Sequence, residues 1–396
     1  VGMPKVTVIL TSLNHEQFIG QSIESVLAQS FSDFELYIID DASKDKSWDI
    51  INTYKDHRIH VVRNDEQRRG IWGYRMVIGE RAKGEYIAIH HSDDLWEPDK
   101  LAEQVAYLDA HPDIGAVFTK VLPITDDGSP LSDPKHFYSS VFDQPNRNRH
   151  EWLRFFFERG NALCHPSVLI RRQCYEDCGL YRFGLAQLGD FDMWIRLCLK
   201  YEIHILDRKL TRFRVRAGEL NTSGDRPEVR TRSQFEFFHL LKNFLLLDRV
   251  DLEKVFPEAV SFSAKSGWVK EYVLGRVFLM LKPYPFAALF GAGLLFEIVT
   301  DPEKAAMVRE QYGFDYRDCI ALTGQYDFFS TEEFRGLWLR FVDTEERMKE
   351  LAASHALLGQ ALSERERQIA EYERLLAERD LRLADRDMMI AGMYRA

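Results

Sequence analysis

The part of the sequence that decides the fold reads YIAIHHSDD over residues 86–94. Its apolar first half is typical of a buried strand, and Asp93 and Asp94 follow where that strand should end. Carboxylates at this edge of an α/β sheet can hold a divalent cation against phosphate oxygens, because hard cations prefer oxygen ligands. The same residues also fit an Asx-rich turn that caps a following helix. Taken alone, the run leaves a metal site and a turn equally open.

Short β-branched runs alternate with helical stretches through the first 120 residues. We expect strands at 5–11, 34–40, 59–63, 86–90 and 114–119, and helices at 17–29 and 46–55. Such alternation is the pattern of βαβ units in a parallel sheet. These residues therefore predict a nucleotide-binding half-domain of the α/β class.

The pattern of the chain changes twice after this region. Between 151 and 221 we expect a strand at 167–171, a helix at 191–200 and a strand at 203–216, which would complete the sheet. Helical patterning dominates residues 226–341. The predicted organisation is an α/β, Rossmann-like domain with a mostly parallel sheet over 1–225, a helical subdomain over 226–341 and a coiled-coil stem over 342–396.

Apolar residues recur every seven positions near the C-terminus, as at Met348, Leu362, Ile369, Leu376 and Ile390. A stripe sustained for about six heptads predicts a coiled coil, and hence a homodimer or homotrimer. Arginines at 365, 379 and 386 in the partner seam would weaken its packing or fix its register. A lone charged helix stabilised by i,i+4 pairs is the alternative. Residues 394–396 form no helix cap, so we expect the natural protein to continue into a further catalytic domain or toward a partner.

Composition and charge restrict the class of protein. A chain of 396 residues with 45% apolar content fits a globular protein, and its net charge of −10 argues against nucleic acid as a partner. The five cysteines form no CxxC pair, which indicates neither a zinc site nor a disulfide framework and fits a reducing cytoplasm. Residues 1–10 lack the pattern of a secretory signal, so we expect a protein that stays inside the cell.

One apolar run, residues 286–296, is too short to span a bilayer. It fits a buried helix or a contact with a membrane surface. Buried helices are the commoner case, because large exposed apolar patches are rare on soluble proteins. We therefore expect residues 286–296 to form a buried helix.

Acidic residues follow three of the predicted sheet elements. Asp40 and Asp41 follow the second strand, Asp93 and Asp94 follow the fourth, and Asp190 with Asp192 lies in the later, mixed region. Strand ends from distant parts of an α/β chain converge on one crevice. The three acidic segments are therefore expected to form one site.

In this arrangement the sequence resembles family two of the inverting glycosyltransferases, which have the GT-A fold. The resemblance spans roughly residues 5–223. The matching segments are PKVTVILTSLN at 4–14, SIESVLAQS at 22–30, FELYIIDDAS at 34–43, AKGEYIA at 82–88, SDD at 92–94, HPS at 165–167, Arg171-Arg172 and Gly179. The ordered set is far more specific than any one of its members.

The resemblance implies residues that bind the donor nucleotide. Thr11 and Asn14, after the first strand, and Asp41, after the second, would contact the base and ribose of a nucleotide sugar. A carboxylate can accept a hydrogen bond from the imide N–H of uracil or thymine. Arg75 would lie near the diphosphate, where its planar guanidinium suits phosphate oxygens. A helix cap for Asp41 and a surface ion pair for Arg75 are the structural alternatives.

The family's metal motif reads Asp-x-Asp, and here its first position is His91. The resemblance implies that Asp93 holds Mn²⁺ or Mg²⁺ between the two phosphates of the donor. Imidazole is an acceptable ligand for transition metals. His91 could therefore ligate the ion, leave its position to water, or hydrogen-bond the sugar, and the sequence leaves these three roles open.

The resemblance also assigns a general base and a second basic residue. Asp190 aligns with the aspartate of the family's Glu-Asp pair, whose glutamate position is Gly189 here. It would take the proton of the acceptor hydroxyl, although it also fits the N-cap of a following helix. Arg216 stands where relatives often have a histidine, and it could neutralise the diphosphate directly.

The predicted function is transfer of a sugar, with inversion, from a UDP- or dTDP-linked donor to a carbohydrate or lipid-linked saccharide acceptor. The expected setting is bacterial surface polysaccharide synthesis in the cytoplasm, at the inner face of the cytoplasmic membrane. One alternative is a non-catalytic scaffold built on a degenerate transferase domain, which the departures at His91, Gly189 and Arg216 favour. A nucleotidyltransferase would need a Gly-rich basic loop for a triphosphate, which residues 10–14 lack.

Overall fold

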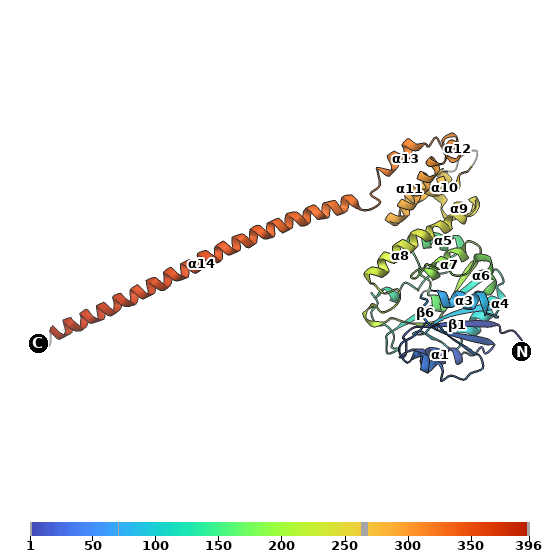
Figure 1. The fold of residues 1–396 in the computed structure, drawn as a ribbon, viewed down its shortest axis with the longest axis horizontal. Helices are drawn as coiled ribbons and strands as arrows, with labels where there is room; N and C mark the ends of the chain where they lie inside the picture. Colours follow the sequence, from blue (N-terminus) through green and yellow to red (C-terminus); the bar gives the residue numbers. More distant parts are fainter. Residues whose placement is uncertain (1, 70, 263–267, 394–396) are drawn as a thin grey trace. The chain divides into compact units, whose positions relative to one another are not determined.

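The computed structural model describes residues 2–69, 71–262 and 268–393, with side chains as far as residue 384. The chain divides into two compact units, Val1–Tyr326 and Asp327–Ala396. The first unit holds one eight-stranded sheet and most of the helices (Figure 1). The second unit is built on one long helix. Each unit is described separately below.

Four parallel strands form the half of the sheet that the N-terminal sequence predicts. They are β1 (Val6–Ser12), β2 (Phe34–Asp40), β3 (Ile59–Arg63) and β4 (Tyr86–His91), in the order β3-β2-β1-β4. The bounds of β2 and β3 are those predicted, and β1 and β4 end one residue later. Because these strands are parallel, their carboxyl ends lie at one edge of the sheet, where the acidic residues follow.

Helices cover both faces of this half-sheet. In Figure 1, α1 (Ile19–Leu27) lies on one side of β1, and α3 (Trp72–Glu80) and α7 (Gly189–Cys198) lie on the other. Ile19, Ile23 and Val26 of α1 pack with Leu101 of α4 (Lys100–Ala110) against fully buried strand residues. Each such aliphatic side chain stabilises the fold by about 1.5–3 kcal/mol. Burial on both faces explains why β1 and β2 read as continuous apolar runs.

The other half of the sheet is mixed. The order continues β4-β7-β6-β8-β5, with β7 (Leu169–Arg171) antiparallel to both β4 and β6 (Ile114–Ile124). Strand β8 (Glu202–Arg214) runs parallel to β6, and β5 (Leu95–Trp96) runs antiparallel to β8. The sequence did not predict β5, and β6 is five residues longer than expected. The mixed α/β sheet confirms the predicted fold class.

Three helices of the sheet region lie between these strands or follow them. They are α2 (Ser47–Ile51), α5 (Arg149–Arg159) and α6 (Arg172–Cys178). Helix α5 begins at a capping box: the Asn148 side chain accepts the backbone N–H of Glu151, and the Glu151 side chain accepts the backbone N–H of Asn148. It ends at Gly160, whose φ of 83° favours glycine. This helix end leads directly into a loop of the candidate site.

A helical region completes the first unit. Its helices are α8 (Pro227–Leu240), α9 (Arg249–Val255), α10 (Lys270–Leu281), α11 (Pro285–Thr300), α12 (Pro302–Tyr312) and α13 (Tyr316–Thr323). Helices α10 and α11 pack closely where Gly275 faces Gly291. A Cβ at Gly275 would lie only 2.9 Å from the Gly291 carbonyl oxygen, so this approach requires glycine. The apolar run at 286–296 lies in α11, and Phe290, Leu295 and four other residues of that run are buried.

No single helix of the described residues is both long enough and apolar enough to cross a bilayer. Helices α11 and α12 satisfy both criteria only when taken together, and the pair is bent by 105°.

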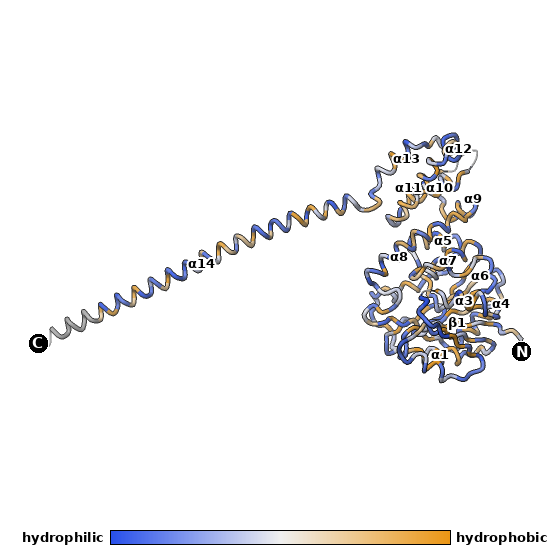
Figure 2. The backbone as a smooth tube through the Cα atoms, in the orientation of Figure 1, coloured by the Kyte–Doolittle hydropathy of each residue, from blue (hydrophilic) through white to orange (hydrophobic). Residues whose placement is uncertain are grey.

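The second unit contains α14 (Thr331–Met393), one helix of 63 residues, or about 95 Å at 1.5 Å per residue. Apolar residues recur along it in Figure 2, and they are exposed: Leu362, Ile369 and Leu376 keep 62%, 51% and 49% of their surface. The helix begins eleven residues before the predicted stem, and Phe334 and Phe341 extend the seven-residue spacing back to its first turns. Residues 394–396, on which the expected continuation depended, lie outside the described residues.

Candidate active site

Three possible metal ligands follow β4. One ligand atom each of His91, Asp93 and Asp94 can be chosen so that all three lie within 4.8 Å of one another. His91 Nδ1 is 3.5 Å from Asp94 Oδ2. Asp94 is 1% exposed, and its Oδ2 has no hydrogen-bond partner among the described residues. A buried carboxylate oxygen without a donor is costly unless a cation or another ligand completes it.

Arg214, at the end of β8, holds the two aspartates in place. Its backbone N–H donates to Asp94 Oδ1 at 2.7 Å, and its Nε donates to the Asp93 carbonyl oxygen at 2.7 Å. Its Nη1 donates to the carbonyl oxygens of Thr125 and Asp126, both at 2.8 Å. With 1% of its surface exposed, Arg214 is a structural cation that fixes the turn after β4.

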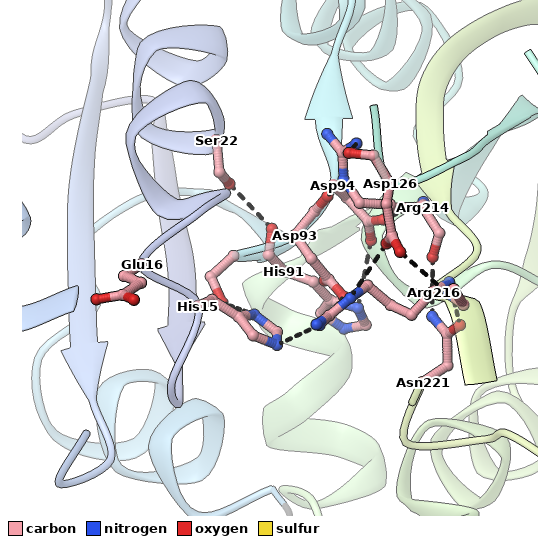
Figure 3. A network of polar contacts seen from close by, with 12 residues as sticks. His15, Glu16, Ser22, His91, Asp93, Asp94, Asp126, Arg214, Arg216 and Asn221 are labelled. Carbon is pink, nitrogen blue, oxygen red and sulfur yellow. Dashed lines mark hydrogen bonds and ion pairs between the residues drawn. The ribbon is translucent and has the colours of Figure 1, made fainter. Parts of the chain in front are cut away.

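Arg216 and His15 meet on the other side of Asp93. Figure 3 shows His15, from the loop after β1, and Arg216, from the segment after β8, reaching toward each other. Arg216 Nη1 lies 3.0 Å from His15 Nε2 and 4.0 Å from Asp93 Oδ2, and its Nε is 3.4 Å from an Asp126 oxygen. Arg216 therefore places a positive charge beside the aspartates.

The tautomer of His15 follows from its neighbours. Burial lowers the pKa of His15, which favours the neutral ring. Arginine is a donor only, so Nε2 accepts from Arg216 and Nδ1 carries the proton. That N–H donates to Ser92 Oγ, 2.7 Å away. His15 thus ties Arg216 to the turn that carries Asp93.

A second polar chain runs from His91 into the protein interior. His91 Nε2 is 3.3 Å from Nδ1 of His165, in the short helix His165–Ser167 before β7. His165 Nε2 is 2.8 Å from the Tyr181 hydroxyl, which is 3.3 Å from the Tyr175 hydroxyl. Tyr181 is fully buried and Tyr175 nearly so. Burial lowers the pKa of His165 well below its usual range, so its ring is neutral.

Asp190 lies in the first turn of α7. Its Oδ2 accepts from Asn161 Nδ2 at 2.9 Å, and its Oδ1 accepts from the Phe191 N–H at 2.8 Å. Burial raises the pKa of Asp190 to about 6, while these two hydrogen bonds and the charge of His91 oppose the rise. The N-cap of α7 is Leu188, not Asp190, and no side chain caps it. The capping alternative for Asp190 is therefore wrong.

The turn before Asp190 is held from the helical region. Glu236, on α8 and 1% exposed, accepts the backbone N–H groups of Ala186, Gln187 and Leu188 at 2.7–2.9 Å. At the next position a Cβ on Gly189 would lie 2.6 Å from Ile71 Cγ2. This contact explains why no side chain stands where the family has a glutamate.

Asp192 has a structural role. It is fully buried, accepts from Arg196 Nε at 2.9 Å and Asn243 Nδ2 at 2.9 Å, and lies 3.1 Å from Arg182 Nη1. These contacts use both carboxylate oxygens. Asp192 therefore joins α7 to the helical region, whereas Asp190 faces the site.

Asp41 and Asn14 organise the loops after β2 and β1. Asp41 accepts from Asn64 Nδ2 at 2.7 Å and from the backbone N–H groups of Arg68 and Arg69 at 2.8 and 3.0 Å. Helix α2 begins after Lys46, so Asp41 is not its cap. Asn14, with φ of 53°, accepts the Lys44 N–H at 2.8 Å. Beside Asp41, a cavity of about 590 Å³ is lined by Ala42, Lys44, Arg63, Asn64, Asp65, Glu66 and Gln67.

Thr11 and Arg75 each contact a buried tyrosine, Tyr74 and Tyr181 respectively. Thr11 Oγ1 hydrogen-bonds the Tyr74 hydroxyl at 2.7 Å, and the Tyr74 ring centroid is 5.2 Å from that of His165. Arg75 Nη1 donates to the Tyr181 carbonyl oxygen at 2.7 Å, and its guanidinium stacks on Phe183. Arg75 makes no ion pair among the described residues, so the surface ion pair is not formed.

The structure brings His91, Asp93 and Arg216 into direct proximity, with Asp190 close enough to interact electrostatically with His91. Thr11 is connected to them through its hydrogen bond to Tyr74. Burial, together with the charges of Asp93 and Asp190, raises the pKa of the Tyr74 hydroxyl. Asp41 and Asn14 lie in the neighbouring loops. Sequence reasoning placed Asp94 in the acidic run after the fourth strand and His165 in a quoted motif, without an individual role for either. It assigned no role to His15, Asn161 or Arg214.

The donor set of this site fits a divalent cation. Two carboxylates and one imidazole supply oxygen and nitrogen ligands, and Asp94 Oδ2 has an unused lone pair directed at His91. A partly buried carboxylate with a raised pKa, Asp190, lies close enough to interact electrostatically with His91 of the same cluster. The arrangement can bind a cation and an anionic ligand while Asp190 takes a proton.

Comparison with known proteins gives one family. Residues 7–177 match the sequence model described as "Glycosyl transferase family 2". An uncharacterized glycosyltransferase of Methanocaldococcus jannaschii is 29% identical over 217 residues, which are 54% of this chain and 71% of that protein. The Escherichia coli protein named UDP-Glc:alpha-D-GlcNAc-diphosphoundecaprenol beta-1,3-glucosyltransferase WfaP is 37% identical over 107 residues, 27% of this chain and 42% of that protein.

The fold is shared with a solved structure. Residues 1–349 of S. aureus TarS, in complex with UDP-GlcNAc, align with a TM-score of 0.50 over 78% of this chain and 91% of that chain. At 17% identity the likeness concerns the fold alone.

Proposed function

The chain carries a glycosyl transferase family 2 domain with a GT-A-like fold and is a glycosyltransferase, and from this premise we propose its donor, acceptor and mechanism. The donor is a nucleotide sugar, UDP- or dTDP-linked. The acceptor is a hydroxyl of a carbohydrate or of a lipid-linked saccharide. Transfer inverts the configuration at the anomeric carbon.

The observation that carries this proposal is the setting of Asp190. Burial raises its pKa to about 6, so the carboxylate is ionised at neutral pH yet remains a strong enough base to accept a proton. Asn161 and the Phe191 N–H orient it, and it interacts electrostatically with His91 of the proposed cation site. Asp192, the structural carboxylate of the same helix, is paired with the guanidinium groups of Arg182 and Arg196, whereas the partners of Asp190 are a neutral amide and a backbone N–H.

The reaction is a single displacement. The acceptor oxygen attacks the anomeric carbon while its proton passes to Asp190. The bond between that carbon and the phosphate oxygen breaks, and the nucleoside diphosphate leaves with the electron pair. Attack opposite the leaving group turns an α-linked donor into a β-linked product.

Charge on the leaving diphosphate is stabilised by residues after β4 and β8. A divalent cation held by Asp93, with His91 and Asp94 beside it, would offset that charge when bound. Arg216 adds a fixed guanidinium next to Asp93, which His15 keeps in place. Thr11 and Arg75 flank the same region through Tyr74 and Tyr181.

The nucleoside is assigned to the side of Asp41. The cavity of about 590 Å³ beside it is large enough for a nucleoside, and its polar lining suits a base and ribose. Asp41 uses three hydrogen bonds and keeps acceptor capacity for an imide N–H. A UDP donor is supported by the names of WfaP and of the TarS complex, which both include a UDP-sugar.

The proposed setting is bacterial surface polysaccharide synthesis at the inner face of the cytoplasmic membrane. WfaP, by its name, acts on a diphosphoundecaprenol-linked sugar, which is a lipid-linked acceptor. An acceptor of this kind would bring the enzyme to a membrane surface.

Helix α14 is proposed to join copies of this chain. Its apolar stripe, Phe334 to Leu383 at seven-residue spacing, is exposed on the described helix, and apolar stripes of this period pair in coiled coils. Exposed arginines of the partner seam would set the register of the oligomer. The stem would hold several catalytic units together.

The experiment that tests the function is a panel of nucleotide sugars assayed for release of nucleoside diphosphate, with and without Mn²⁺. We expect one UDP- or dTDP-sugar to be turned over and Asp190→Asn to lower kcat about 10²- to 10⁴-fold. The variant should still bind the donor, which a donor-induced rise in melting temperature would show. If no donor is turned over and none raises the melting temperature, the domain is a scaffold.

A further inference from the structure

The two ring nitrogens of His91 bear on which divalent cation the site binds. His91 stands where the family has the first carboxylate of its metal motif, and the structure gives each of its ring nitrogens a different neighbour. Nδ1 faces Asp94 Oδ2 at 3.5 Å, and Nε2 faces His165 Nδ1 at 3.3 Å. Which nitrogen holds the proton decides whether His91 can be a ligand.

The 3.5 Å gap between His91 Nδ1 and Asp94 Oδ2 is too long for a good hydrogen bond. It is close to the spacing of two ligands on one ion, because atoms bound at about 2.1 Å at cis angles lie about 3.0–3.4 Å apart. Asp94 Oδ2 has no other partner within the described chain and is buried. The two atoms are therefore placed as neighbours around a shared ion.

His165 supplies what a ligating His91 needs behind it. A histidine bound through Nδ1 carries its proton on Nε2, and that N–H requires an acceptor. His165 Nδ1 can accept it when His165 Nε2–H donates to the Tyr181 hydroxyl, 2.8 Å away. The Tyr181 O–H can in turn donate a hydrogen bond to the Tyr175 hydroxyl, 3.3 Å away. The buried chain therefore accommodates the metal-bound tautomer without moving an atom.

We propose that His91 binds the cation through Nδ1, with Asp93 and Asp94, and that this nitrogen makes the site select a first-row transition metal over Mg²⁺. His165 is a positioning residue that orients the His91 ring from behind. The inference rests on the proposed function for the identity of the site as a metal centre. It adds that the substitution of His for Asp changes the metal preference rather than abolishing the metal.

The chemistry of the ligand set decides the selectivity. Mg²⁺ prefers oxygen ligands and binds imidazole poorly, whereas Mn²⁺, Co²⁺ and Zn²⁺ accept nitrogen. Arg216 near Asp93 lowers the negative charge of the site for every divalent cation alike, so the preference rests on the imidazole nitrogen. Loss of the residue behind a metal-bound histidine costs about 10- to 100-fold in metal affinity.

The test measures metal binding to the full chain, with Mn²⁺ or Mg²⁺ alone and with UDP added. Calorimetry gives the two affinities, and pulsed EPR of bound Mn²⁺ detects a coordinated ¹⁴N. We expect a nitrogen signal in the wild type and none in His91→Asp. The ratio of Mn²⁺ to Mg²⁺ affinity should fall about tenfold or more in His91→Asp.

Variants at His165 separate positioning from folding. His165→Leu should weaken Mn²⁺ binding about 10- to 100-fold, whereas His165→Asn, whose amide can still accept near the Nδ1 position, should restore most of it. His57→Ala, at a side chain 92% exposed, is the matched control and should change nothing. Melting curves without metal identify a His165 variant that fails to fold. In that case the metal preference of His91→Asp alone tests the proposal.

Three results would overturn the proposal: no ¹⁴N signal from bound Mn²⁺, equal metal preference in wild type and His91→Asp, or no Mn²⁺ binding at millimolar concentration with or without UDP. The outcome is separable from that of the proposed function. A protein that shows the nitrogen signal but turns over no nucleotide sugar keeps the metal site and loses the function. A protein that turns over a nucleotide sugar without the nitrogen signal keeps the proposed function and loses His91 as a metal ligand.

Discussion

Asn161 Nδ2 donates a 2.9 Å hydrogen bond to Asp190 Oδ2 and so connects the loop after α5 to the first turn of α7. The amide stabilises the ionised carboxylate and therefore opposes the rise that burial causes in the pKa of Asp190. The strength of the base depends on this balance, and the first two predictions follow from it.

Activity should fall below about pH 6. Asp190 must be ionised to accept a proton, and burial raises its pKa to about 6, so the active form is present above that pH and is lost as the pH decreases. We expect log(kcat/KM) to be level above about pH 7 and to decrease with unit slope below about pH 6. A profile that stays level down to pH 5 would contradict the assignment of Asp190 as the base.

Asn161→Ala should move this acidic limb to higher pH. Removing a donor to the ionised carboxylate favours the protonated form, so the pKa of Asp190 should increase further above its usual range. The pH profile of kcat/KM measures the change directly. Gln173→Ala, at an exposed side chain of α6, is a control that leaves both hydrogen bonds of Asp190 in place, and its profile should match the wild type.

Arg216→Gln should raise the KM for the donor about tenfold or more, because a hydrogen bond to a charged group is worth about 1.5–3 kcal/mol. The guanidinium lies beside Asp93 and is held by His15, where the diphosphate is expected. Arg212→Gln removes a more exposed arginine of β8 that pairs with Glu97 and should leave the KM unchanged. Equal KM values for the donor in the two variants would contradict the assignment of Arg216 to the donor site.

Glu236→Gln should lower both the stability and kcat. Gln can offer one acceptor oxygen to the three N–H groups that Glu236 binds, and an unsatisfied buried donor costs about 1–3 kcal/mol. Urea unfolding measures the first effect and steady-state kinetics the second. Glu228→Gln, on the same helix but exposed, is the control. An unchanged kcat would show that the turn at 186–188 does not help to position Asp190.

Leu362→Lys should dissociate the oligomer that α14 is proposed to form, because a charge in an apolar seam is costly to bury. Sedimentation velocity of the full chain gives the mass in each case. Gln360→Lys adds the same charge on the other side of the helix and should keep the mass of the wild type. A monomeric wild type would reject the coiled coil.

The strands of the N-terminal half-sheet were predictable because their signal is local. Strands β2 and β3 have the predicted bounds, since their largely apolar runs end at polar residues. Strand β5, only two residues long, exists through its pairing with β8, and the extension of β6 likewise depends on β8. Pairing partners about 90–115 residues apart leave no local pattern in the sequence.

The same distinction applies to the candidate site. The positions of His91, Asp93 and Asp190 could be predicted from the order of motifs in the family, although Asp190 lies in the first turn of α7 and not at a strand end as expected. His15 was not, because it depends on Arg216, 201 residues later in the chain. Asn161, Arg214 and Glu236 act through hydrogen bonds to residues of other elements, and nothing in their own neighbourhood distinguishes them from ordinary polar residues.

The antiparallel direction of β7 decides which of its ends feeds the site. Since β7 opposes β4, the segment that enters it, with His165, arrives beside the carboxyl end of β4 and His91. Insertions in the chain before β7 would therefore displace the ring behind the proposed metal ligand. Insertions soon after Arg171 would displace Tyr175 and Tyr181, the hydrogen-bonded tyrosines behind that ring. The position of His165 thus depends on the segments at both ends of β7.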